Sequence, residues 1–135
     1  MDRTFLHHEP KSQYAYALDE NRLMLMLRTK KSQCASVSLL FGDPFYWGPG
    51  EAESKWVWRG LNDTNYHLSL DYQDRDYDYW RIVISPNWKR VRYAFLIDGT
   101  WLFTARGVYN LTETPEKTAD LSDYFNFPYI NTEDI

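Results

Sequence analysis

The sequence predicts an all-β protein made of two packed antiparallel sheets. Apolar residues alternate with period two along much of the chain, and turn-forming residues recur about every eight to twelve positions. Aromatic residues, which favour strands over helices, make up 18% of the composition. A chain of 135 residues is about one domain and is long enough to bury a core. We therefore expect one β-sandwich over residues 1–135, with a closed barrel as the alternative.

The clearest predicted element is a hairpin in residues 89–107. Residues 91–97 alternate apolar with mixed side chains, and Trp101 and Phe103 continue this alternation on the return strand. Asp98-Gly99 between them supplies the two positive φ angles of a tight turn. Because a hairpin with one apolar face is not stable alone in water, a second sheet must cover that face.

The other expected elements follow the same alternation. Leu23, Leu25 and Leu27 line one face of an early strand, while Val37 and Leu39 point inward from the next. Turn residues such as Asp, Asn, Gly and Pro separate the segments. The remaining predicted strands are residues 4–8 (a short edge strand), 13–18, 23–28, 34–41, 54–60, 66–72, 77–85 and 107–111, with a helical turn inside 117–126.

Charge and cysteine content limit the possible partners. The net charge of −4 argues against nucleic acid and anionic membranes, which both attract a basic excess. The basic runs at residues 28–31 and 89–92 are more typical of strand edges protected against aggregation. Cys34 is the single cysteine, which excludes an intrachain disulfide and fits a reducing compartment. Residues 1–12 have no apolar signal-peptide core, so we expect a cytoplasmic protein.

Two segments resemble metal sites only superficially. Asp74, Asp76 and Asp78 start like a calcium loop, but the following glycine and distal glutamate are missing. In His7-His8-Glu9, neighbouring residues on a strand would point to opposite faces. We expect a solvated hairpin loop at the aspartates, and neither a metal nor another cofactor.

No catalytic arrangement is marked in the sequence. The three histidines are not accompanied by a nucleophile-elbow sequence, which nucleophilic catalysis by a Ser–His–Asp triad on a hydrolase fold would present. Carboxylate pairs such as Glu51 with Glu53, or Asp71 with Asp78, could cleave glycosides, but nothing distinguishes them from other acidic residues. We therefore expect no catalytic residue in this chain.

A loop framed by glycine and proline is the main candidate site. Asp43, Pro44, Phe45, Tyr46 and Trp47 place three rings in succession, which cannot all point into the core. Exposed flat rings can stack on the C–H faces of sugars, or they can serve as anchors of a protein interface. Rings folded over the end of the sandwich, as a lid on its core, are the third possibility.

Six segments of the chain resemble the N-terminal domain of the neopullulanase, cyclomaltodextrinase and maltogenic-amylase group of the α-amylase superfamily. This domain is also classed as a starch-binding module. The matching segments occur in the family's order from about residue 5 to residue 130. They are residues 14–16, 25–31, 42–47, 77–80, 89–95 and 125–130.

The resemblance implies an immunoglobulin-like antiparallel β-sandwich that precedes a (β/α)₈ catalytic barrel, absent from this chain. It implies a homodimer in which the loop Asp43 to Trp47 reaches the partner subunit's cleft, where maltodextrins or other α-glucans bind. Phe45 stands where some relatives carry tyrosine, so stacking on a sugar is retained and a hydroxyl contact is lost.

Three roles are compatible with these observations. The first is a non-catalytic domain of an enzyme acting on maltodextrins, cyclodextrins or pullulan, contributing to dimerisation and to the partner's cleft. The second is an independent starch- or maltooligosaccharide-binding module, with the loop rings or Trp56 and Trp58 as its platform. The third is a protein-interaction sandwich with no role in sugar binding. A stand-alone enzyme is disfavoured because no acid/base arrangement is visible.

Overall fold

The computed structural model describes residues 4, 6–42, 47–49, 56–58, 66–85, 91–119 and 123–127. Over these residues it contains strands and short 3-10 turns. The elements are β1 Ala15–Ala17, β2 Leu23–Lys30, β3 Val37–Gly42, β4 Trp47–Pro49, β5 Trp56–Trp58, β6 Ser69–Gln73, β7 Tyr77–Ile84, β8 Val91–Ile97, β9 Trp101–Thr104, β10 Gly107–Asn110, the 3-10 helix η2 Pro115–Ala119 and β11 Phe125–Phe127.

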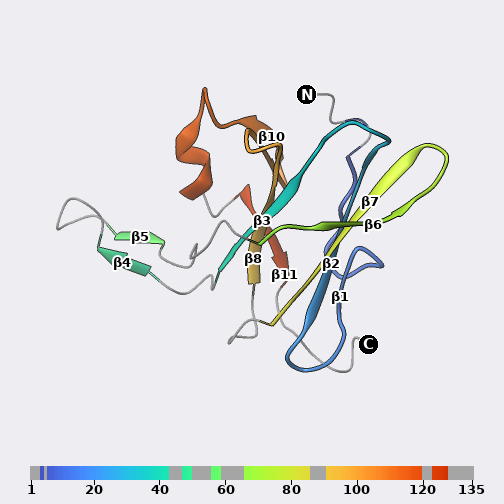
Figure 1. Ribbon diagram of the computed structural model, residues 1–135. Coiled ribbons are helices and arrows are strands. Elements are labelled where there is room, and N and C mark those ends of the chain that lie inside the picture. Colours follow the sequence, from blue (N-terminus) through green and yellow to red (C-terminus); the bar gives the residue numbers. More distant parts are fainter. Residues whose placement is uncertain are drawn as a thin grey trace.

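Two antiparallel sheets form the body of the molecule (Figure 1). The first sheet has the order β1-β2-β7-β6. In the second sheet, β8 is central: β3 pairs along one edge, while β9 and β11 share the other. β10 extends this sheet beyond β9. β4 and β5 form a separate two-stranded sheet, which lies to one side of the main sheets in Figure 1. This architecture confirms the predicted all-β, immunoglobulin-like sandwich rather than a closed barrel.

One segment hydrogen-bonds to both sheets. Residues 66–68 bond to β3, through Leu39 N to Tyr66 O at 2.7 Å and Leu68 N to Val37 O at 2.8 Å. Directly afterwards, β6 pairs with β7 in the other sheet, with a bulge between its residues 70 and 72. The chain therefore crosses from one layer to the other here, and this corner closes one side of the sandwich.

The core lies between the two sheets, as alternation predicts. Alternate residues of β8, namely Val91, Tyr93, Phe95 and Ile97, are fully buried, and so are the leucines of β2. Each strand contributes one apolar face, so neither sheet could bury its own face without the other. The hairpin turn after β8 has φ +53° at Asp98 and +71° at Gly99, as the sequence predicts.

A histidine is hydrogen-bonded inside this core. His8 Nδ1 lies 2.7 Å from the Met26 carbonyl, which can only accept, so Nδ1 carries the proton. The neutral ring's Nε2 therefore accepts from the Tyr93 hydroxyl, also at 2.7 Å. Phe95 and Phe125 pack edge-on against the same ring, each with centroids 4.8 Å apart. The N-terminal segment is thus fixed to the second sheet through a polar contact shielded from water.

Several boundaries differ from the predictions. The expected edge strand at residues 4–8 is a single bridge between His7 and Arg28, and β3 begins at Val37 rather than at residue 34. Where the sequence predicts a helical turn inside residues 117–126, the structure has a 3-10 helix at Pro115–Ala119, and residues 125–126 belong to the strand β11 instead. An ion pair of 3.1 Å joins Lys117 of this helix to Asp123. β11 was not predicted, because three residues are too short for alternation to identify a strand.

We predict that Tyr93→Phe destabilises the protein by about 1–3 kcal/mol, because it leaves the buried His8 Nε2 without its donor. Urea unfolding measures the difference. Tyr72→Phe is the matched control: that side chain is 58% exposed, so its stability should stay within about 0.5 kcal/mol. Equal stabilities of the two variants would contradict the assigned role of the Tyr93 hydroxyl.

We also predict a specific loss of stability at mildly acidic pH. Burial lowers the pKa of His8 from 6.5 to about 4, so between these values the unfolded chain binds a proton that the folded chain excludes. Stability should therefore fall as pH drops from about 6.5 to about 4, by up to about 3 kcal/mol. Unfolding measured at a series of pH values tests this.

The matched variant for that experiment is His8→Gln. The pH dependence of the native protein minus that of the variant isolates His8 from other titrating groups. Exposed carboxyls contribute to the pH dependence of stability at lower pH. The hydrogen bond from the Asn21 amide, for example, lowers the pKa of Asp19 below 3.8. Parallel curves for the two proteins between pH 6.5 and 4 would refute the assignment.

Candidate functional site

The predicted aromatic loop joins β3 to β4. β3 ends at Gly42 and β4 begins at Trp47, which pairs with Trp58 in β5. Asp43, Pro44, Phe45 and Tyr46 lie outside the described residues, as does the side chain of Trp47. The predicted contact of this loop with a sugar or a partner subunit therefore stays a prediction.

The acidic hairpin at residues 73–78 uses its carboxylates for internal hydrogen bonds. Asp74 Oδ1 accepts from the amides of Asp76 and Tyr77 at 2.9 and 2.7 Å, and its Oδ2 accepts from the Tyr79 hydroxyl. Asp78 instead points to the other side of the strand and is 3% exposed. The aspartates therefore do not converge on one point, and Asp74 closes the turn.

The histidines at the N-terminus also separate. The His7 ring packs edge-on against Tyr14 at 4.7 Å, while His8 lies in the core against Tyr93. Their different surroundings agree with the predicted opposite faces. Within the described part of the chain, no group of three or more His, Cys, Asp or Glu side chains is placed to hold a metal ion.

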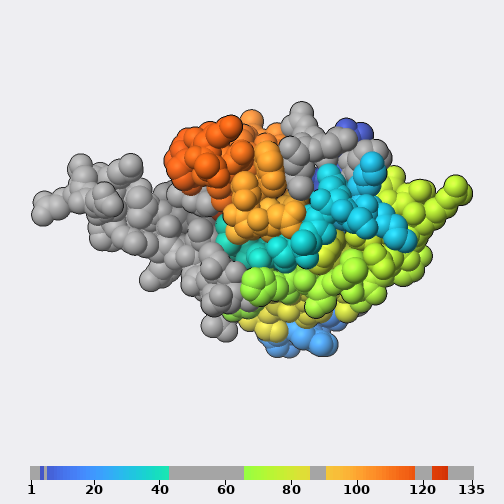
Figure 2. Space-filling model, turned by 45° about the horizontal axis from the view of Figure 1, so that its top comes forward, coloured from blue at the N-terminus to red at the C-terminus, as the bar shows by residue number. Residues whose placement is uncertain are grey.

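An open hollow of about 570 Å³ lies between the β2–β3 loop and the β6–β7 hairpin. In Figure 2 the light-blue segment that leads into β3 lies against the yellow-green hairpin. Its lining combines an apolar wall with several acceptors of hydrogen bonds. The lining residues are Ser32, Gln33, Cys34, Ala35, Leu70, Gln73, Asp78, Trp80 and Asp98.

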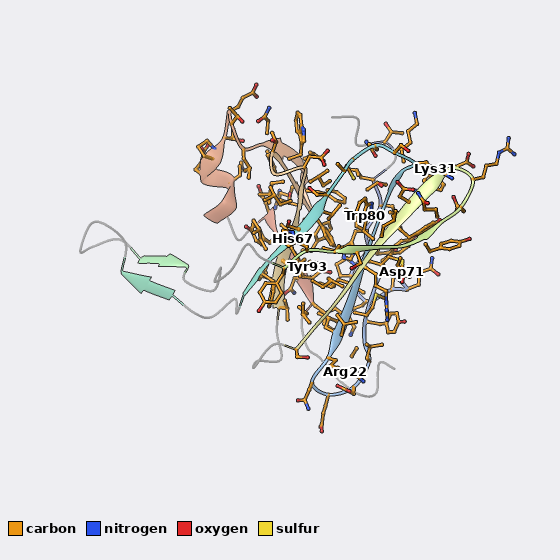
Figure 3. The ribbon with its side chains drawn as sticks, in the orientation of Figure 1. Arg22, Lys31, His67, Asp71, Trp80 and Tyr93 are labelled. Carbon is orange, nitrogen blue, oxygen red and sulfur yellow. The ribbon has the colours of Figure 1, made fainter. Side chains whose placement is uncertain are left out.

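Asp78 connects the two sides of the hollow. Its Oδ2 accepts from the amide of Ser32, in the β2–β3 loop, at 3.0 Å. Its Oδ1 accepts from Gln73 Nε2, at the end of β6, at 2.7 Å. Trp80, two residues further along β7, donates its indole N–H to Thr29 Oγ1 at 3.1 Å. Figure 3 labels Trp80, with Lys31 just after the end of β2 and Tyr93 nearer the centre of the view. The wall is thus attached to both β2 and its following loop.

Asp98 fixes the other part of the β2–β3 loop. Its Oδ1 accepts from the amides of Ala35 and Ser36 at 2.8 and 2.9 Å, and its own amide donates to the Ser36 carbonyl at 3.0 Å. Three hydrogen bonds therefore join this loop to the β8–β9 turn. The loop carries Cys34, and burial raises the pKa of its thiol to about 11, so the thiol is protonated at neutral pH.

Sequence reasoning did not find this hollow. The local pattern identifies Asp98 only as a turn residue, and Asp78 only as part of an acidic loop or of a chance carboxylate pair. The lining comes from four separate segments, and nothing in local periodicity shows that they meet. The available signal was an aspartate at an inward position of β7, since a buried carboxylate requires hydrogen-bond donors nearby.

The outer face of the first sheet is a second surface rich in rings. Tyr72 and Tyr79 are cross-strand partners with centroids 5.2 Å apart, and the Arg28 guanidinium lies 4.1 Å from the Tyr77 ring centre. All five residues of β6 are exposed, including Leu70, which is 45% exposed at the hollow. Several tyrosines thus sit half exposed on a strand surface.

None of the described helices is long and apolar enough to cross a membrane.

The chain is similar in sequence to the N-terminal part of known amylases. A family model described as "Alpha amylase, N-terminal ig-like domain" matches residues 1–131. A maltogenic alpha-amylase of Bacillus acidopullulyticus is 34% identical over 138 aligned positions, covering all of this chain. A cyclomaltodextrinase of Geobacillus thermopakistaniensis (strain MAS1) is 31% identical, again over the whole chain. The chain spans 21% of the length of each relative.

A solved structure shares the fold. It is a cyclomaltodextrinase that superposes with a TM-score of 0.73 at 23% sequence identity, covering 98% of this chain and 20% of its own chain. The resemblance expected from the six sequence segments is therefore confirmed, both by the family match and by the sandwich architecture.

We predict that Asp98→Ala destabilises the protein by about 1–3 kcal/mol, because it removes two hydrogen bonds to the loop and forces alanine into a positive φ. Asp98→Asn is the matched variant: it keeps an acceptor oxygen, and asparagine tolerates this backbone conformation. The Asp98→Asn variant should lose less than about 1 kcal/mol of unfolding free energy. Chemical denaturation that ranks both variants alike would contradict this role of Asp98.

Proposed function

Because the chain belongs to the alpha amylase N-terminal ig-like domain family, we propose that it is the non-catalytic N-terminal domain of an α-glucan hydrolase. The substrates of the parent enzyme would be maltodextrins, cyclodextrins or pullulan. The observation that carries this proposal is the match of the family over residues 1–131, together with relatives named maltogenic alpha-amylase and cyclomaltodextrinase.

The length relationship supports an accessory role. Because this chain corresponds to about a fifth of each relative, most of the relatives' length lies outside the matched region. We propose that a (β/α)₈ barrel follows in the parent protein and carries the catalytic carboxylates. Two carboxylates of the described residues hold the β2–β3 loop: Asp78 accepts from the Ser32 amide and Asp98 accepts from the Ala35 amide.

In this proposal the aromatic loop would shape the substrate cleft of a second subunit and would take no part in the chemistry. Asp43, Pro44, Phe45, Tyr46 and Trp47 follow β3, which is held along its length by β8, so the loop starts from a rigid base. Its rings would stack on the glucan in the cleft of a second subunit and narrow that cleft, excluding water and bulky substrates. The parent enzyme would then be a homodimer in which each N-terminal domain completes the partner's binding site.

The cellular location and partners follow from the same proposal. A single cysteine, which cannot form a disulfide within the chain, suits a reducing compartment, so we propose a cytoplasmic enzyme. The net charge of −4 is unfavourable for nucleic acid or an anionic membrane surface. The partners would be an α-glucan and a second copy of the parent protein.

We predict that this chain alone does not hydrolyse β-cyclodextrin and binds maltoheptaose only weakly. Reducing-end production measures hydrolysis, and tryptophan fluorescence measures binding. Trp47→Ala should weaken the binding by about fivefold or more, since loss of an aromatic anchor costs more than about 1 kcal/mol. Tyr72→Ala, which alters a ring on the first sheet away from the loop, is the matched control and should bind like the native chain.

Different results would favour different roles. Turnover of β-cyclodextrin by the chain would refute a non-catalytic domain. Tight binding that disappears in Trp47→Ala would favour an independent glucan-binding module. Equal affinity of the native and Trp47→Ala chains would refute the contact assigned to the loop.

A further inference from the structure

We propose that His8 is a proton-sensitive switch for the N-terminal segment, which we define as residues 6–9. When the neutral His8 ring gains a proton, this segment detaches from β2 while the two sheets stay packed. The inference is carried by the hydrogen bonds of His8, by the surroundings of its ring and by the few bonds that hold the segment to the sheet. It is independent of any contact with α-glucan.

The hydrogen bonds of His8 fit only the neutral ring. Nδ1 donates to the Met26 carbonyl and Nε2 accepts from the Tyr93 hydroxyl, each at 2.7 Å. A proton added to Nε2 turns this acceptor into a donor. The Tyr93 hydroxyl would then have to accept, and its own hydrogen would lose its partner, because this hydroxyl makes no other hydrogen bond among the described residues. A buried donor without an acceptor is unfavourable.

The surroundings of the His8 ring contain no counter-charge within the described part of the chain. β8 contributes Tyr93 and Phe95, β11 contributes Phe125, and β2 contributes a backbone carbonyl. His7 adds a repulsive charge when protonated, and no carboxylate is among the groups that shift the pKa of His8. Because an unpaired buried charge is costly, protonation favours a conformation in which the ring reaches water.

Few bonds hold the N-terminal segment to the first sheet. Within the described residues its backbone pairs with β2 at one bridge, through the His7 amide to the Arg28 carbonyl at 3.0 Å and the Arg28 amide to the His7 carbonyl at 3.1 Å. β2 itself is paired with β7 along its whole length, from Leu23 to Lys30, so it keeps its place when the segment leaves. Such a segment can open locally at a lower free energy than the whole domain unfolds.

Acidification shifts this opening equilibrium in one direction. In the released segment His8 titrates with its ordinary pKa of 6.5, whereas burial lowers the pKa of the enclosed ring to about 4. The released form therefore binds a proton that the closed form excludes, and opening becomes more favourable as pH falls between these two values. Between pH 7.5 and pH 5 the equilibrium constant for opening should rise about thirtyfold.

Opening would uncover two features of the sandwich. The edge of β2 at Arg28 would present backbone groups that now bond to His7, and the rings of Tyr93 and Phe125 would lose their contact with His8. A free strand edge is a template for pairing with an extended segment of another chain. The switch would thus couple acidic pH to the availability of this sheet edge.

Native-state hydrogen exchange followed by NMR, at several pH values and low urea concentrations, tests the switch. The amides of His7 and Arg28 report opening of the segment, and those of Ala94 and Phe95 report unfolding of the sandwich, because β8 is paired on both edges. Each protection factor is referred to the intrinsic exchange rate at the same pH. Protection should fall on acidification at both places, since both openings expose His8.

Urea separates the two openings. Local opening exposes little surface, so protection of the His7 and Arg28 amides should be lower than that in β8 and nearly independent of urea. Protection of the β8 amides should fall steeply with urea, because global unfolding exposes the core. This comparison is made within the native chain and needs no variant.

Two variants identify the group that takes up the proton. His8→Gln removes the titrating ring and should reduce the change at the Arg28 amide between pH 7.5 and pH 5 from about thirtyfold to less than about threefold. His7→Gln is the matched control, because it replaces the neighbouring histidine and keeps His8. It should retain the change of about thirtyfold.

Urea-independent exchange of the Arg28 amide that increases on acidification in the native chain and in His7→Gln, but not in His8→Gln, would support the switch. Equal protection and equal urea dependence of the Arg28 and β8 amides would overturn it, since the segment would then leave only when the whole domain unfolds. A pH dependence at the Arg28 amide that persists in His8→Gln, or that is absent from the native chain, would also overturn it.

Discussion

The burial of one face of β8 against the leucines of β2 is the constraint on which the rest of the structure depends. β8 is paired on both edges, by β3 on one side and by β9 and β11 on the other, so its position is fixed within its sheet. Its inward residues Tyr93 and Phe95 have no contact with water and require the first sheet as a cover. The His8–Tyr93 hydrogen bond then fixes the N-terminal segment to this same strand.

The core strands determine where the loops at one end of the sandwich lie. The β8–β9 turn begins where β8 ends, and its Asp98 holds the loop that leads into β3. On the other layer, Asp78 projects inward from β7 and holds the beginning of that same loop. The loop between β2 and β3 is thus attached to both sheets at once. A preformed hollow arises at this end because strands of both layers stop there and their polar turn residues face one another.

Period-two alternation was sufficient to predict the fold, but only where strands are long. β2, β7 and β8 each present a largely apolar inward face, broken by Thr29 in β2 and Asp78 in β7, and the Asp98-Gly99 turn has a specific backbone requirement, so these elements could be derived from local pattern. β11 has three residues and the N-terminal bridge has one, and both depend on long-range pairing that local sequence does not encode. The hollow could not be derived for the same reason. It is assembled from segments up to 66 positions apart in the chain, from Ser32 to Asp98.

The central proposal is that the chain is a two-layer scaffold that contacts α-glucan through the loop at residues 43–47 and has no hydrolytic chemistry. Titration of the isotopically labelled chain with maltoheptaose, followed by NMR, reads both parts in one sample. The account predicts chemical-shift changes for the amides of residues 43 and 45–47, little change in the middle of β2 and β7, and anomeric sugar signals that stay constant with time. Shift changes centred on the outer face of the first sheet, or the appearance of new reducing ends, would contradict it.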